Sequence, residues 1–298
     1  MGIRTWIQRK RRPQFAEWER TLPPASSEQC INGRRYLENS YYLLPKDLQE
    51  INRLDFQHFL LRRLLGNNYA APIPQSTRSI LDVGCGTGLW TREMAQQFSH
   101  AQIVGLDLEL SHLANNNPAN CQFVAANILQ ELPFADASFD FVHQRLLVAA
   151  LPAQAWPGVV RELVRVTSQR GWLELLEIGQ SMTNPGPATS RYLQWWMVFS
   201  ERTGFDTTVV EHLGHMLQDA GLSQVTQQQI KAPVGQWGGH AGTLLATNML
   251  EVIQAVKQRF CDVLQLSPAH FDTTINALPA EWEEYHTAFH FYLAYGQK

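Results

Sequence analysis

The chain has 298 residues, of which 45% are hydrophobic and only 17% are charged. This composition supplies enough apolar side chains for a large core and excludes an intrinsically disordered protein. The formal net charge is −3, so the chain as a whole lacks the basic character of a nucleic-acid-binding protein.

The positive charge is concentrated at the beginning of the chain. Residues 1–20 contain six lysines and arginines against two glutamates, and we expect residues 1–35 to form a basic, flexible tail. The first residues lack the apolar segment of a signal peptide, and no apolar run reaches the length of a membrane span. We therefore expect a soluble, cytoplasmic protein that binds neither membranes nor nucleic acid.

The predicted elements begin with an amphipathic helix at about residues 47–65, which Asp47 caps. From Arg78 onward, short apolar runs alternate with helical segments. Strands are predicted at 79–83, 102–107, 121–125, 139–143 and 171–178, and helices near 89–98, 110–115 and 153–166. Such alternation is typical of a parallel sheet with helices on both faces.

The pattern is looser beyond residue 180. Helices are predicted at about 192–199, 209–220 and through most of 238–284, and strands at 223–230 and 286–295. We interpret residues 36–298 as one domain with helical insertions at about 183–205 and 238–284.

The most informative segment is a strand that runs into a glycine-rich turn, Ile80-Leu81-Asp82-Val83-Gly84-Cys85-Gly86-Thr87-Gly88. Glycines let backbone N–H groups and a helix N-terminus approach a ligand closely. A dinucleotide fingerprint requires a third glycine at position 89, where this chain has Leu89. The next strand ends at Asp107, whose carboxylate can accept both hydroxyls of a ribose. The spacing predicts a nucleoside site that does not require a pyrophosphate.

This turn resembles the first motif of the class I S-adenosylmethionine-dependent methyltransferases, and 132–142 (LPFADASFDFV) resembles a later motif of the same family. A narrower resemblance, to methyltransferases related to fungal regulators of secondary metabolism, lies in 42–47 (YLLPKD), 50–58 (EINRLDFQH) and 171–178 (GWLELLEI). The resemblance implies an α/β fold with a Rossmann-like, seven-stranded, mostly parallel sheet. It also implies S-adenosylmethionine as the cofactor. In addition to this fold, we expect helical lid elements.

The resemblance also implies roles in cofactor binding. Asp82 would orient the ammonium group of the methionine moiety, and Asp107 would hold the ribose. In the family, an aspartate often accepts from the adenine amino group where this chain has Asn127, whose carbonyl can still accept. Asp82 and Asn127 have an alternative role as caps of neighbouring turns. The remaining residues expected at the cofactor are Gly84, Cys85 and Gly86 along the methionine moiety, Leu108 and Ile128 around the adenine, and Gln144 beside the methionine end.

The acceptor side is less defined. His143, at the end of the predicted strand 139–143, is the candidate for a general base, with a core histidine that has no catalytic part as the alternative. Glu177 either binds the substrate or satisfies backbone donors. No set of three ligands with metal-binding spacing is identified, so we predict no metal site.

Aromatic residues suggest where the acceptor binds. Tyr41, Tyr42, Trp195 and Trp196 either line an apolar, aromatic acceptor pocket or fill core. We predict that 41–44 and the helix at 192–199 form a lid, with the acceptor between them and the cofactor sulfonium.

The sequence therefore predicts an enzyme, an S-adenosylmethionine-dependent methyltransferase that acts on an oxygen or nitrogen of an apolar or aromatic small molecule, such as a secondary metabolite. Two alternatives remain open. One is a cofactor-binding regulator that acts through protein partners. The other is a methyltransferase fold that catalyses a different reaction and uses the bound cofactor for electrostatics.

Overall fold

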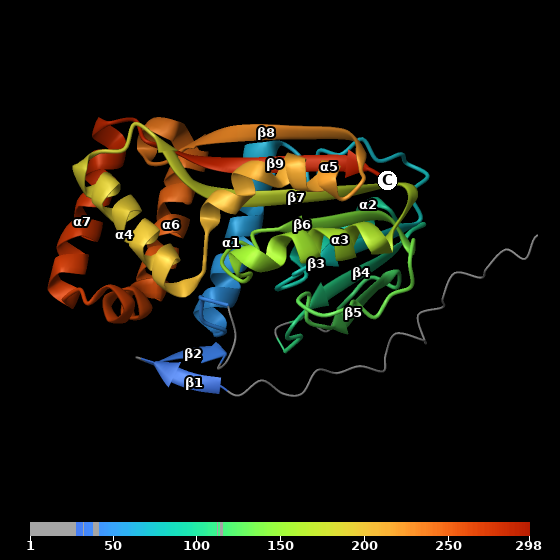
Figure 1. Ribbon diagram of the computed structural model, residues 1–298, viewed down its shortest axis with the longest axis horizontal. Coiled ribbons are helices and arrows are strands. Elements are labelled where there is room, and N and C mark those ends of the chain that lie inside the picture. Colours follow the sequence, from blue (N-terminus) through green and yellow to red (C-terminus); the bar gives the residue numbers. More distant parts are fainter. Residues whose placement is uncertain (1–27, 32, 38–41, 112, 114–115) are drawn as a thin grey trace, which may run out of the picture.

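The computed structural model describes residues 28–31, 33–37, 42–111, 113 and 116–298. Its centre is a seven-stranded sheet in the order β5-β4-β3-β6-β7-β9-β8 (Figure 1). The strands are β3 (Ser79–Val83), β4 (Gln102–Asp107), β5 (Cys121–Ala125), β6 (Phe139–Arg145), β7 (Thr167–Thr183), β8 (Ser223–Pro233) and β9 (Ala288–Gln297). β9 runs antiparallel to both of its neighbours, and the other pairs are parallel. The predicted Rossmann-like, seven-stranded, mostly parallel sheet is confirmed.

Helices cover both faces of this sheet because its strands are apolar on both sides. Leu81 and Val83 of β3 pack in one core with α3 (Trp156–Val166) and α5 (Leu213–Asp219). Ile80, on the opposite face, packs in a second core with α2 (Leu89–Gln97). The alternation of side chains along a strand produces this division.

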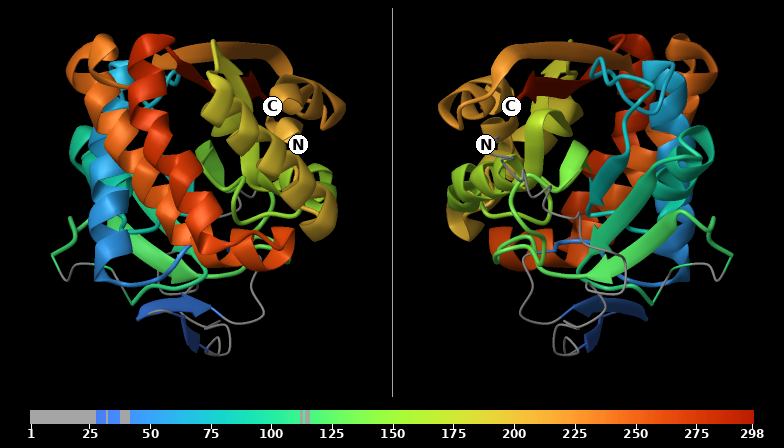
Figure 2. Two further views of the ribbon diagram at one scale, coloured as in Figure 1. Left: turned by 90° about the vertical axis from the view of Figure 1, so that its left-hand side faces the viewer. Right: turned by 90° about the vertical axis from the view of Figure 1, so that its right-hand side faces the viewer.

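Three helices form a separate layer at one end of the sheet. These helices are α4 (Pro187–Thr203), α6 (Gly239–Leu264) and α7 (Pro268–Glu284), which lie together in Figure 1. Their apolar faces form a third core, in which Tyr192, Phe199 and Phe260 are almost fully buried. α1 (Leu48–Leu65) runs beside α6 and also contributes to this core (Figure 2).

The cap expected at the start of α1 is present. The Asp47 side chain accepts the N–H of Glu50 at 3.0 Å, which satisfies one free donor of the first turn. Gly66 ends the helix in the left-handed conformation with φ 75°. None of the helices in the described part of the chain combines the length and apolarity that crossing a membrane requires.

The structure differs from the predicted elements at several places. The strands β1 (Glu28–Ile31) and β2 (Arg34–Leu37) form an antiparallel hairpin that starts inside the segment expected to be a flexible tail (Figure 1). The helix expected near 110–115 is absent from the described part of that segment. The long helical stretch at 238–284 is two helices with a break at Gln265, which adopts a left-handed φ of 56°. Short 3-10 helices occupy Ala153–Ala155, Thr207–His212 and Gln236–Gly238.

Candidate active site

The glycine-rich turn after β3 has a backbone that only glycine adopts without strain. Gly84 has φ 70° and Gly88 has φ 72°. A Cβ at Gly84 would lie 2.5 Å from Leu147, and a Cβ at Gly88 would lie 2.6 Å from the ring of Phe123. The glycines therefore allow both the turn and its close contact with neighbouring segments.

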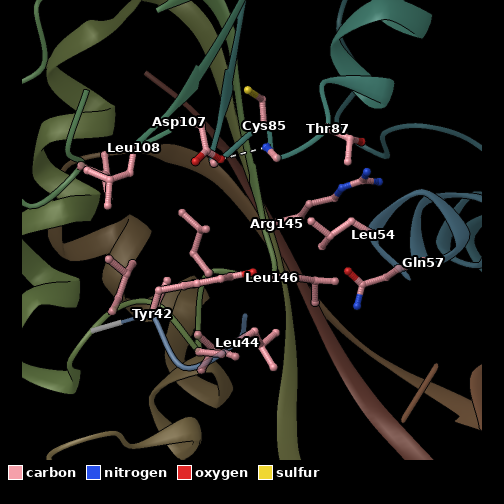
Figure 3. Close-up of a pocket in the computed structure, with 18 of the residues that line it drawn as sticks. Tyr42, Leu44, Leu54, Gln57, Cys85, Thr87, Asp107, Leu108, Arg145 and Leu146 are labelled. Carbon is pink, nitrogen blue, oxygen red and sulfur yellow. Dashed lines mark hydrogen bonds between the residues drawn. The ribbon is translucent and has the colours of Figure 1, made fainter. Parts of the chain in front are cut away.

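Asp107 lies at the end of β4, next to this turn. Its Oδ2 accepts the N–H of Gly86 at 2.8 Å, which Figure 3 shows as a dashed line. Its Oδ1 accepts the N–H of Glu109 at 3.3 Å and lies 3.6 Å from Nζ of Lys46. The carboxylate is thus held at the carboxyl edge of the sheet, where ligands of open α/β sheets bind.

A cavity of about 670 Å³ opens at this edge. A volume of this size is typical of small-molecule sites. The predicted cofactor residues that line it are Asp82, Gly84, Cys85, Gly86, Asp107, Leu108, Asn127 and Ile128. The structure therefore brings eight of the nine predicted residues to one cavity.

Gln144 is the ninth residue, and it does not line the cavity. Its side chain is fully buried, and its Nε2 donates to Oε1 of Glu177 at 3.2 Å. Glu177 also accepts the N–H of Leu147 at 2.9 Å and the N–H of Val148 at 3.0 Å. Of the two roles considered for Glu177, the structure shows the one in which it satisfies backbone donors.

Burial has a strong effect on Glu177. It raises the pKa of this carboxyl to about 7, although three donors oppose the shift. The residue fixes the turn after β6, where Leu146 has a left-handed φ of 54° and both Leu146 and Leu147 line the cavity. Glu177 therefore shapes the cavity wall from behind.

His143 lies behind the cavity instead of in it. Its ring is 1% exposed and stacks on Trp90 of α2, with 3.9 Å between ring centroids and an interplanar angle of 6°. Its Nδ1 lies 3.2 Å from Oδ1 of Asp82, and the other oxygen of that carboxylate, Oδ2, accepts the hydroxyl of Thr91 at 2.6 Å. Asp82 lines the cavity and His143 does not. This placement corrects the expectation of a base beside the methyl group, and it corresponds to the alternative of a core histidine.

The tryptophans of α4 also lie outside the cavity. Trp195 stacks on Phe271 of α7, and Trp196 meets the edge of Phe260 of α6 at 4.7 Å between centroids. They belong to the core of the helical layer, so the prediction that α4 forms half of a lid is wrong. α4 faces α6 and α7, and other segments cover the cavity.

The segment before α1 does reach the cavity. Tyr42, Leu44 and Lys46 line it, and Tyr42 projects into the space in Figure 3. Tyr41 lies outside the described residues. The N–H of Leu43 donates to the carbonyl of Ala149 at 3.1 Å, which ties this segment to the turn after β6.

Arg145 is a cavity residue that the sequence interpretation missed. Its Nη2 lies 2.9 Å from Nδ1 of His58, and no carboxylate within the described residues lies at ion-pair distance from it. Burial and the nearby guanidinium lower the pKa of His58 to about 4, so this imidazole is neutral. Arg145 therefore offers a half-buried positive charge beside Leu54 and Thr87 (Figure 3). Its position directly after Gln144, at the end of a strand, was a usable signal.

The other half of the cavity is mostly apolar. α1 supplies Leu54, Leu60 and Leu61 to its wall, and α6 supplies residues that no sequence motif singled out. The α6 residues are Leu245, Asn248, Met249 and Val252. Among the described residues, no three His, Cys, Asp or Glu side chains are grouped to hold a metal ion.

The chain is similar to known methyltransferases. A methyltransferase-domain family matches residues 80–171. The "Methyltransferase pytC" of Aspergillus terreus is 30% identical over 254 residues, which cover 80% of this chain and 77% of that protein. The "Secondary metabolism regulator LAE1" of Cochliobolus heterostrophus is 27% identical over 230 residues, covering 72% of this chain and 74% of that protein.

A solved structure has a similar fold. It is the phosphoethanolamine N-methyltransferase 2 of Haemonchus contortus in complex with S-adenosyl-L-methionine, with 14% sequence identity and a TM-score of 0.50. The similarity covers 88% of this chain and 61% of that chain. At this identity, the likeness concerns the fold alone.

Proposed function

Because the chain belongs to the S-adenosylmethionine-dependent methyltransferase family that includes pytC, we propose that it methylates an oxygen or nitrogen of a small molecule with an apolar body. The observation that carries this proposal is the continuity of the cavity. One cavity contains the glycine turn and Asp107 at one end and the apolar wall of α1 and α6 at the other. Cofactor and acceptor can therefore meet within it.

The residues of the first end fit the cofactor. Leu108 and Ile128 offer apolar surfaces for an adenine ring, and Asp107 offers a carboxylate for the ribose hydroxyls. Asp82 faces the methionine end with a carboxylate for the ammonium group. The guanidinium of Arg145, which has no carboxylate partner among the described residues, is suited to the carboxylate of the cofactor.

When bound, the cofactor would supply a methyl group on a sulfonium: a lone pair of the acceptor oxygen or nitrogen would bond to the methyl carbon, the C–S bond would break to release S-adenosylhomocysteine, and the acceptor's proton would pass to solvent. The contribution of the chain is alignment and exclusion of water. The described residues that line the cavity include no histidine, so we assign no general base. We assign His143 the role of a positioning residue, because it holds Asp82 from behind.

We also propose that Tyr42, Leu44 and Lys46 cover the cavity. Leu44 is 7% exposed and Lys46 is 7% exposed, so the segment is packed against the rest of the protein. Lys46 lies over the ring of Tyr42 at 4.9 Å as well as near Asp107. Burial, together with the nearby Glu50, raises the pKa of the Tyr42 phenol above its usual value. Tyr42 therefore stays neutral and can donate a hydrogen bond.

The name of one relative favours a second candidate function. LAE1 is called a regulator of secondary metabolism, and this chain would by analogy bind the cofactor and act through protein partners. A single labelling experiment separates the two functions. The full chain is incubated with S-adenosylmethionine labelled in the methyl group and a panel of phenols, aromatic amines and hydroxyketones.

The proposed function predicts label in organic-extractable product, at a rate that rises with the concentration of one of the panel compounds. Transfer of the label to a protein of an added cell extract, and not to a small molecule, supports the second candidate function, a regulator. Tight cofactor binding with no transfer of label to any compound contradicts the proposed small-molecule methyltransferase. The variant Asp107→Ala is the negative control, because it lacks the carboxylate assigned to the ribose.

A further inference from the structure

The apolar half of the cavity contains two buried polar side chains with unsatisfied atoms. Arg53 of α1 and Asn248 of α6 line the cavity and are 4% and 1% exposed. Among the described residues, neither Nη1 of Arg53 nor Nδ2 of Asn248 has a hydrogen-bond partner. Buried polar atoms are nearly always paired in folded proteins. Two exceptions beside a ligand cavity point to an atom of the ligand.

Glu50 explains why Arg53 is oriented as it is. Nε of Arg53 donates to Oε2 of Glu50 at 2.8 Å, and Nη2 donates to Oε1 at 2.5 Å. This paired contact within α1 uses two of the three guanidinium nitrogens. The third nitrogen, Nη1, is a donor with no acceptor capacity, so only a hydrogen-bond acceptor can satisfy it.

Gln57 connects this arginine to α6. It lies one turn after Arg53 on α1, and its Nε2 donates to Oδ1 of Asn248 at 3.3 Å. This contact uses Oδ1 of Asn248 and leaves its Nδ2, a hydrogen-bond donor, without a partner among the described residues. Because α1 and α6 run side by side (Figure 2), Arg53, Gln57 and Asn248 form one polar strip, which we name the α1–α6 polar strip.

We propose that the α1–α6 polar strip binds an uncharged oxygen of the methyl acceptor, a carbonyl or hydroxyl carried by an apolar body. This inference rests on the proposed function, since it assigns the space beyond the cofactor residues to the acceptor. Leu60, Leu245 and Met249 line the same cavity and offer apolar surface for the body of the acceptor.

The charge balance selects a neutral oxygen. The positive charge of Arg53 is already matched by Glu50, so the strip offers donors without a net positive charge. A carboxylate in the same place would be buried without a counter-charge, which is unfavourable. A ketone or hydroxyl oxygen accepts from both free donors at no such cost.

Three probes of nearly equal shape test this inference. They are 2-acetylnaphthalene, 2-isopropylnaphthalene and 2-naphthoate, which present a ketone, a hydrocarbon and a carboxylate on one apolar body. Dissociation constants are measured by ligand fluorescence on the full chain saturated with S-adenosylhomocysteine. We expect the ketone to bind roughly tenfold more tightly than the hydrocarbon, the effect of one hydrogen bond to a charged donor, and more tightly than the carboxylate.

Two variants assign the preference to the strip. Asn248→Leu removes the amide at nearly constant volume, and Arg53→Lys keeps the charge beside Glu50 but removes Nη1. Each should reduce the ketone preference to about threefold or less. The matched controls are Gln254→Leu on the exposed face of α6 and Arg63→Lys on the exposed face of α1, which should retain the preference. The wild-type comparison stands even if one variant fails to fold.

The possible results separate this inference from the proposed function. Equal binding of ketone and hydrocarbon by the wild type means that the strip holds only water, and overturns the inference. The inference is also overturned if the carboxylate binds most tightly, if the ketone preference survives in both variants, or if no probe binds. In those cases intact binding of S-adenosylhomocysteine, measured on the same sample, leaves the proposed function standing. Loss of that binding in the wild type would instead contradict the proposed function.

Discussion

The carboxylate of Asp107 is the strongest single determinant expected for cofactor binding, and Asp107→Asn tests it directly. The substitution keeps the size of the side chain and one carbonyl oxygen. That oxygen can still accept the N–H of Gly86, which Oδ2 accepts at 2.8 Å. The glycine turn is therefore retained, while the negative charge facing the ribose is removed.

The magnitude follows from the number of hydrogen bonds affected. A hydrogen bond to a charged group contributes about 1.5–3 kcal/mol, and one between neutral groups contributes about 0.5–1.5 kcal/mol. Replacing two charged bonds to the ribose with one neutral bond and an unmatched amide should cost about 2 kcal/mol. This loss corresponds to a roughly thirtyfold increase in the dissociation constant.

The assay is calorimetric titration with S-adenosylhomocysteine, and Asp140→Asn is the matched control. Asp140 lies on β6, and its carboxylate accepts the N–H of Arg78 at 2.8 Å, away from the cavity. The control should bind like the wild type. An Asp107→Asn protein with wild-type circular dichroism and a dissociation constant within about threefold of the wild type would refute the assignment of the ribose to Asp107.

Two further predictions concern Arg145, the last residue of β6, and Glu177 of the neighbouring strand β7. Arg145→Gln should weaken binding of S-adenosylhomocysteine, measured by calorimetry, by roughly tenfold. Binding of 5′-methylthioadenosine, which lacks the amino-acid moiety, should be unchanged. Equal losses for both ligands would contradict the proposed contact between Arg145 and the carboxylate of the cofactor. Burial raises the pKa of Glu177 from 4.5 to about 7, so between these pH values the folded protein holds a proton that the unfolded chain releases. The resulting stabilisation of the folded protein is complete below pH 4.5 and is lost as the pH rises to about 7. The melting temperature of the wild type relative to Glu177→Gln should therefore fall over that interval and level off above it, and a difference independent of pH would argue against a shifted carboxyl.

The sheet was the most predictable part of the molecule. The bounds expected for β3, β4 and β5 agree with the structure, because each is a short apolar run that ends at a turn residue such as Gly84. The hairpin at residues 28–37 was not predicted. Its strands are short, and three of the four residues of β1 are exposed, so no alternation of apolar and polar residues marks them.

The grouping of the residues expected at the cofactor into one cavity was predictable, because they are close together in sequence and follow strand ends. His143 shows the limit of that reasoning. It also ends a predicted strand, but alternation turns it toward α2 and the ring of Trp90. The elements packed against each face of the sheet determine which face borders a cavity. The position of a residue along its strand does not show this.

The acceptor half was hidden for a different reason. Aromatic residues at helical spacing, such as Trp195 and Trp196, can pack against another helix or line a pocket equally well. Only the position of α7 in the folded protein shows that they pack against a helix. Arg53 and Asn248 lie 195 positions apart in the chain. Neither forms a motif with the other, so only the folded arrangement of α1 and α6 shows that they share one wall.

The division of the core has a consequence for how such an enzyme diversifies. The cofactor end of the cavity is built on the cores of the sheet, whereas the residues that α6 contributes belong to the core of the helical layer. Substitutions at Leu245, Met249 or Val252 would therefore change the shape of the end of the cavity proposed for the acceptor through the core of the helical layer. Under the proposed function, a change of substrate can therefore be made on one helix while the residues around the glycine turn stay the same.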